Sequence, residues 1–147
     1  MVVYNFQLTP FGRVLVAFSQ EKICFLGFVV TTSEDLELEF LRFFSLATKN
    51  TLLNFDLGFW TKKAHALDDF AVPGTSFQRS VWVELLKIPH GQTVTYSQVA
   101  ARLGKSTAVR AVARAIGANF VSMLIPCHRV VGKNGKLTGY RWGLEAK

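Results

Sequence analysis

One cysteine of the sequence stands where a thiol could act as a nucleophile. Cys127 lies in the run Ile125-Pro126-Cys127-His128-Arg129-Val130-Val131, next to a histidine and an arginine. A cysteine reacts as its thiolate, and a nearby base or positive charge lowers the cost of forming that thiolate. The pattern therefore predicts nucleophilic chemistry at Cys127, with His128 as the candidate base.

The apolar run before this cysteine predicts the element that holds it. Residues 120–125 are apolar except for Ser122, which favours a buried strand, and Pro126 biases Ile125 toward an extended form. We expect the strand to present the sulfur of Cys127 to a substrate. Because successive side chains of extended structure point to opposite faces, His128 would reach the sulfur through a water molecule or a bend.

The other cysteine, Cys24, lies in an apolar strand pattern and is expected to be a buried, inert thiol. The two cysteines are far apart and show no CxxC or Cys/His ligand spacing. Neither a disulfide framework nor a metal site is predicted.

Charge divides the chain into two unlike halves. Residues 1–71 carry six lysines and arginines against eight acids, whereas residues 72–147 carry eleven against two, within a total of +7. The basic half predicts a polyanionic partner, of which nucleic acid is the commonest; solubility or affinity for a membrane surface are the alternatives. The turn Pro73-Gly74-Thr75 coincides with this change, so we predict domains at 1–71 and 72–147.

Targeting signals are not evident in the sequence. It has no run of about twenty apolar residues, and its first residues lack the pattern of a signal peptide. We expect a soluble, intracellular protein that is not a membrane protein.

The N-terminal half reads as a small sheet with one helix. The first thirty residues alternate apolar and polar positions around turns, which predicts an antiparallel meander. Ser33 before Glu34-Asp35 predicts an N-capped helix near 34–46. The segment 50–70 is ambiguous.

The C-terminal half reads as helical. Apolar spacing predicts a helix from Phe77 to Leu86, a second over 97–103 closed by Gly104, and a third over 107–116 after an N-cap at Ser106. The last two form a helix-turn-helix candidate.

The third of these helices has two different faces. Val109, Val112 and Ile116 share the apolar face, whereas Arg110 and Arg114 are an i, i+4 pair elsewhere. Small residues such as Ala111 would let the helix approach a duplex while the arginines reach phosphates or bases. A solvated surface face is the alternative.

Together, these motifs resemble the O6-alkylguanine-DNA alkyltransferase family. The run around Cys127 is similar to the family's active-site signature, and the resemblance covers 72–147 strongly and 1–71 weakly, through residues 9–12. The supporting motifs are Phe77-Gln78, Val81-Trp82, Ile88-Pro89, Gly91, Thr95-Tyr96, Arg110-Ala111-Val112, Asn119 and Thr138-Gly139-Tyr140. The resemblance implies an α+β fold: an N-terminal α/β domain with a ribonuclease-H-like sheet, and a helical, winged-helix-like C-terminal domain with a helix-turn-helix.

The activity that the resemblance implies is direct DNA repair. An alkyl group, usually methyl, passes irreversibly from O6-alkylguanine (or O4-alkylthymine) in flipped-out duplex DNA to Cys127, without a cofactor. Flipping is needed because the alkyl carbon lies inside the duplex. We expect a monomer that binds the minor groove of double-stranded DNA in the cytoplasm, with the nucleoid, or in the nucleus of a eukaryote.

The resemblance also implies a role for each site residue. The catalytic set is Cys127 as acceptor, His128 as water-linked base, Asn119 as hinge, and Tyr96, which rotates the base and protonates guanine N3. The DNA-binding set is Tyr96, Ser106, Thr107, Arg110, Ala111 and Arg114, with Arg110 filling the gap left by the flipped nucleotide. The substrate pocket is Ile116, Pro126, Val130, Tyr140, Arg141 and Trp142.

Three other interpretations remain open from the sequence. A non-repairing relative would bind alkylated DNA without transfer, a regulator would use Cys127 as a sensor, and a cysteine hydrolase would turn over repeatedly. In the family a glutamate on a following helix orients the histidine; here Glu145 or the terminal carboxylate at Lys147 are the candidates. Without that carboxylate we expect slower transfer.

Trp142 generates a prediction about the adduct, because the resemblance places a small glycine at that position. A bulky indole should narrow the pocket entrance. Methyl adducts should therefore react faster than benzyl adducts or free-base inhibitors, as measured by intact mass after incubation with each. Equal rates for methyl and benzyl would contradict this role of Trp142.

Overall fold

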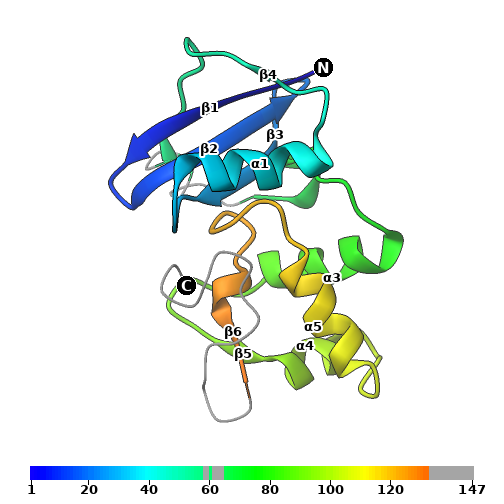
Figure 1. The fold of residues 1–147 in the computed structure, drawn as a ribbon. Coiled ribbons are helices and arrows are strands. Elements are labelled where there is room, and N and C mark those ends of the chain that lie inside the picture. Colours follow the sequence, from blue (N-terminus) through cyan, green and yellow to red (C-terminus); the bar gives the residue numbers. More distant parts are fainter. Residues whose placement is uncertain (58–59, 61–64, 133–147) are drawn as a thin grey trace. The chain divides into compact units, whose positions relative to one another are not determined.

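The computed structural model describes residues 1–57, 60 and 65–132 (Figure 1). These residues form two compact units, which we describe separately. The sheet unit contains 1–57, 60, 68–73 and 120–122, and the helical unit contains 65–67, 74–119 and 123–132. The predicted domains at 1–71 and 72–147 stay a proposal.

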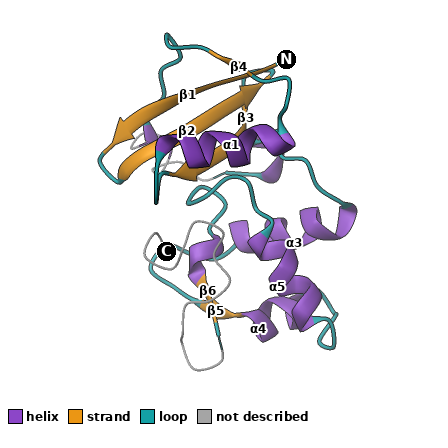
Figure 2. Ribbon diagram, viewed as in Figure 1, coloured by secondary structure: helices purple, strands orange, loops and turns teal. Residues whose placement is uncertain are grey.

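The sheet unit is built on an antiparallel meander, as predicted. β1 (Val2–Thr9), β2 (Gly12–Ser19) and β3 (Lys22–Phe28) pair in sequence, and β4 (Thr48–Lys49) joins β1 in parallel. The resulting order is β3-β2-β1-β4, with α1 (Ser33–Phe43) lying along the sheet (Figure 2). The α+β class is confirmed.

Aromatic packing holds α1 on the sheet. The Phe40 ring, fully buried, lies 4.9 Å from Tyr4 and 5.0 Å from Phe25 between ring centroids. The predicted cap at Ser33 is wrong: the hydroxyl of Thr32 accepts the hydrogen bond from the Asp35 amide, and Ser33 is already helical. The helix also ends at Phe43, before the predicted residue 46.

Residues 120–122 belong to the sheet unit and not to a long strand. The Leu26 amide donates to the Phe120 carbonyl at 2.7 Å, and the Ser122 amide donates to the Leu26 carbonyl at 2.9 Å. This single bridge to β3 is followed by a turn in which Met123 has φ +68. The predicted strand over 120–125 is therefore wrong, because a left-handed residue ends the extended chain after one bridge.

The helical unit contains three helices and a small strand pair. Its elements are α3 (Ser76–Leu86), β5 (Val94–Thr95), α4 (Tyr96–Arg102), α5 (Val109–Gly117), the 3-10 helix η2 (Cys127–Arg129) and β6 (Val130–Val131). A further 3-10 helix, Leu67–Asp69, spans the point where the chain changes unit. In the described part of the chain, no helix is long and apolar enough to cross a bilayer.

Two helices of this unit begin with the same sequence device. Thr75 with Gln78 at the start of α3, and Thr95 with Gln98 at the start of α4, each form a complete capping box. In each box the threonine hydroxyl accepts a hydrogen bond from the glutamine amide, and the glutamine side chain accepts one from the threonine amide. Two backbone amides that a bare helix end leaves unpaired are thus satisfied.

Trp82 is the anchor of the helical unit. Its ring is fully buried, and its Nε1 donates to the Ala115 carbonyl at 2.8 Å, which ties α3 to α5. Gly74 lies against this ring: a Cβ there would come within 2.6 Å of Cη2 and Cζ3 of Trp82. The Pro73-Gly74 turn thus needs glycine for close packing against the indole.

We predict that Gly74→Ala lowers the free energy of unfolding by about 1–3 kcal/mol, the usual cost of overpacking. Trp82→Phe removes the outer ring atoms that the new methyl would meet. The Gly74→Ala cost should therefore be smaller when measured in the Trp82→Phe background by urea unfolding. Equal costs in both backgrounds would show that the Trp82 contact does not determine the residue at 74.

Candidate functional site

A helix-turn-helix forms one side of the candidate site. α4 ends in a Schellman motif: Gly104 has φ +69, its amide donates to Ala101, and the Lys105 amide donates to the Ala100 carbonyl at 2.9 Å. Closure of this helix by Gly104 is confirmed.

The predicted N-cap at Ser106 is wrong. The Ala108 amide donates to the Lys105 carbonyl at 2.8 Å, so Ser106 and Thr107 occupy an exposed turn and the helix starts later, at Val109. Ala108 is the N-cap residue and makes no side-chain cap hydrogen bond. Both hydroxyls are thus exposed on the turn between α4 and α5.

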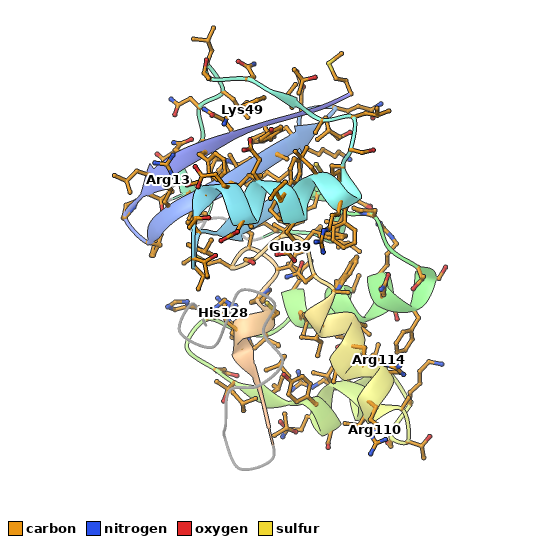
Figure 3. The ribbon with its side chains drawn as sticks, viewed as in Figure 1. Arg13, Glu39, Lys49, Arg110, Arg114 and His128 are labelled. Atoms are coloured by element: carbon orange, nitrogen blue, oxygen red, sulfur yellow. The ribbon has the colours of Figure 1, made fainter. Side chains whose placement is uncertain are left out.

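The two faces of α5 are as predicted. Val112 and Ile116 are buried, whereas Arg110 and Arg114 are exposed on the same helix (Figure 3). Ala111 is half-buried beside them. The burial of Ile116 fits a core role, and its assignment to a substrate pocket stays a prediction.

Cys127 lies in a compact turn that we call the cysteine turn, residues 125–129. Pro126 has φ −82 and ψ 64, and the Cys127 amide donates to the Ile125 carbonyl at 2.8 Å, which is the geometry of an inverse γ-turn. The Arg129 amide then donates to the Pro126 carbonyl at 3.1 Å and closes η2. The expectation that a strand ends at the cysteine is wrong.

This geometry also changes the expected relation of His128 to the sulfur. In a 3-10 helix, successive side chains are about 120° apart instead of on opposite faces. His128 is half-buried in η2 and lies on the helical unit (Figure 3). Its role as a water-linked base stays a prediction.

Asn119 joins the end of α5 to the cysteine turn. Its side chain is 2% exposed, and its Nδ2 donates to the Ile125 carbonyl at 3.0 Å. The same carbonyl accepts the Cys127 amide. The Ile125 oxygen thus holds both the Asn119 side chain and the Cys127 backbone in place.

A second connection runs to α4 from the two residues that follow the cysteine turn. Val130 and Val131 pair in parallel with Val94 and Thr95. Thr95 is also the N-cap of α4, whose first residue is the half-buried Tyr96. The strand pair therefore fixes the start of the helix-turn-helix, and Tyr96 with it, to the residues that follow η2.

The sulfur of Cys127 is less open than we expected. Cys127 is 4% exposed, and both Pro126 and Val130 are buried. The expectation that a strand presents this sulfur to a substrate is wrong, because Cys127 lies buried in the cysteine turn.

The second thiol matches its prediction. Cys24 is 1% exposed within β3, and burial raises the pKa of its thiol to about 12. A thiol with that pKa is protonated at neutral pH and is a poor nucleophile. Both cysteines are free.

Some site residues lie outside the described part of the chain, and others escaped the sequence reasoning. The pocket residues Tyr140, Arg141 and Trp142 belong to the first group, as does Glu145. The Ile125 carbonyl and the hydrogen bond from Trp82 to the Ala115 carbonyl belong to the second. A backbone oxygen has no residue-type signal, whereas the two capping boxes could have been found from their T-x-x-Q pattern.

Similarity to known proteins covers both units. Residues 76–147 match the family model described as 6-O-methylguanine DNA methyltransferase, DNA binding domain. The methylated-DNA--protein-cysteine methyltransferase of Saccharomyces cerevisiae is 57% identical over 74 residues, which are 50% of this chain and 39% of the yeast protein. The chain thus matches well under two thirds of that relative's length.

Two solved structures are similar over nearly the whole chain. The crystal structure of the O6-methylguanine methyltransferase of Mycobacterium tuberculosis is 30% identical, covers 99% of this chain and 87% of its own, and has a TM-score of 0.75. A structure of that organism's OGT in complex with DNA is 29% identical, covers 94% and 83%, and has a TM-score of 0.71.

We predict that Asn119→Ala lowers the free energy of unfolding by about 1–3 kcal/mol, because a buried amide donor to Ile125 is lost. The effect should be local: hydrogen exchange at the Cys127 amide should accelerate more than exchange within α3. Asn119→Asp serves as a matched variant, since a carboxylate of the same shape cannot donate and should cost at least as much. Unchanged exchange at Cys127 in both variants would contradict the anchoring role.

Proposed function

Because this chain belongs to the O6-methylguanine-DNA methyltransferase family, we propose that it repairs DNA by transferring a methyl group from O6-methylguanine to Cys127. The observation that carries the proposal is the shared Ile125 carbonyl. It connects the thiol that His128 and Arg129 follow in sequence to the end of a helix that exposes two arginines.

The proposed chemistry is a single displacement at carbon. The Cys127 thiolate attacks the methyl carbon, a carbon–sulfur bond forms, and the carbon–oxygen bond breaks with its electron pair going to guanine O6. The thiol proton leaves through water to His128, and Tyr96 supplies the proton that the departing base takes up at N3. Exchange with water then removes the extra proton from His128 and restores the proton of Tyr96. The products are guanine and S-methylcysteine, so each molecule reacts once.

The proposed DNA contacts follow the exposed face of the helix-turn-helix. Arg110 would enter the stack and fill the gap left by the flipped nucleotide, and Arg114 would contact phosphate. Ser106 and Thr107 are exposed on the preceding turn and can donate to phosphate oxygens. The small Ala111 permits close approach in the minor groove.

The remaining parts of the proposal concern the state of the protein in the cell. We propose that the protein is a monomer and acts on double-stranded DNA in the nucleoid or, in a eukaryote, in the nucleus. O4-alkylthymine is the proposed second substrate, since it presents the same kind of carbon on an exocyclic oxygen.

Intact mass spectrometry tests the transfer directly. After incubation with a duplex containing O6-methylguanine, the protein should gain the mass of one methyl group on Cys127, without further turnover. Cys127→Ser should bind the duplex and gain nothing, whereas Cys24→Ser, which changes the buried and protonated thiol, should react as the unaltered protein does.

The competing functions give different results in the same experiment. A non-repairing binder would hold the duplex without any gain in mass, and a sensor would show strong preference for one DNA sequence. A hydrolase would release product repeatedly without keeping the methyl group. Methyl found on Cys24 instead of Cys127 would refute the assigned acceptor.

A further inference from the structure

The side chain of Arg129 makes a contact that the proposed transfer does not yet use. Its Nη1 donates to the carbonyl of Ile88 at 2.7 Å. Ile88 is 2% exposed and follows Lys87, the C-cap of α3. The contact therefore joins the last residue of η2 to the C-terminal end of a helix that is 41 residues away in sequence.

The chemistry of this contact makes it a strong one. A hydrogen bond from a guanidinium to a carbonyl is charge-assisted, and 2.7 Å is at the short end for such a bond. The end of a helix carries partial negative charge, which favours a cation there. Nη2 of Arg129 also lies 3.4 Å from Nδ1 of His90, and this second contact attracts when Nδ1 accepts.

The C-terminal side of the cysteine turn is held by β6, which pairs with β5, and by the contact of Arg129 with Ile88. Its 3-10 helix is three residues long, and its N-cap Pro126 provides no side-chain cap. A single 3-10 turn has poor hydrogen-bond geometry and is marginal by itself. Asn119 fixes the start of the turn at Ile125, two residues before the sulfur, and Arg129 is placed two residues after it.

We propose that Arg129 is a positioning residue for methyl transfer, which locks the cysteine turn to the end of α3 and places a cation two residues after Cys127. The inference rests on the proposed transfer activity. Its acceptors in the described part of the chain are a carbonyl and an imidazole, so no carboxylate among them cancels its charge. Partial burial lowers the pKa of the Arg129 guanidinium, and an arginine still remains protonated at neutral pH.

Arg129→Met tests this role by removing donor and charge while keeping an unbranched, apolar side chain. In single-turnover assays with an O6-methylguanine duplex, the transfer rate within the complex should fall about tenfold to a hundredfold, the range expected for a displaced nucleophile. The dissociation constant for the duplex should change by less than about threefold, since Arg110 and Arg114 are untouched. The thiol limb of the pH–rate profile should move to higher pH.

Two further variants separate positioning from general stability. Arg129→Lys keeps the charge without the planar fork, so the pH–rate profile should return toward that of the unaltered protein while the rate stays lower. Lys87→Met is the matched control: it removes a cation from the same helix end, where Lys87 pairs with Glu84 at 2.9 Å, and should leave the rate and the profile unchanged.

The outcome that overturns the inference is specific. If Arg129→Met transfers methyl at the unaltered rate, or loses rate only in proportion to its unfolded fraction with the same pH profile, Arg129 is merely structural. If the unaltered protein itself gains no methyl, the proposed function fails instead. Alkylation of Cys127 by iodoacetamide against pH then still reports whether Arg129 shifts the reactivity of the thiol.

Discussion

The candidate site depends on the carbonyl oxygen of Ile125, which accepts both the Asn119 side chain and the Cys127 amide. A carbonyl oxygen has two lone pairs, so it can accept both of these hydrogen bonds at once. Asn119 follows the C-cap of α5, Ala118, so this one oxygen connects the end of a helix that exposes two arginines to the turn that carries the thiol. A small displacement of α5 would be transmitted to the sulfur through two hydrogen bonds.

The remaining connections of the cysteine turn lead to the other two helices of the helical unit. β6 pairs with β5 immediately before α4, and Arg129 reaches the end of α3. Trp82 then joins α3 to α5 through the Ala115 carbonyl. The ends of α3 and α5 and the start of α4 are thus each connected by hydrogen bonds to the cysteine turn or to the two residues that follow it.

The sequence was sufficient for features with local signals and insufficient for features that depend on distant partners. The meander, α3 and the two faces of α5 follow from periodicity, and Gly104 ends α4 because only a residue tolerant of positive φ fits there. The strand predicted over 120–125 was wrong because only Val121 pairs with the sheet, in a single bridge to Leu26. The N-cap predicted at Ser106 was wrong because Ser106 lies inside the turn that the hydrogen bond from the Ala108 amide to the Lys105 carbonyl closes.

The same distinction explains how the site was found and where its geometry was missed. The residue types around Cys127 identified the nucleophile, but not the inverse γ-turn at Pro126 that turns it inward. Burial of Cys127 has a chemical consequence: at 4% exposure the residue has little contact with oxidants in solvent, and oxidation of a thiol follows its exposure. For the proposed single transfer this protection matters, because any other alkylation or oxidation of that sulfur would consume the molecule without repair.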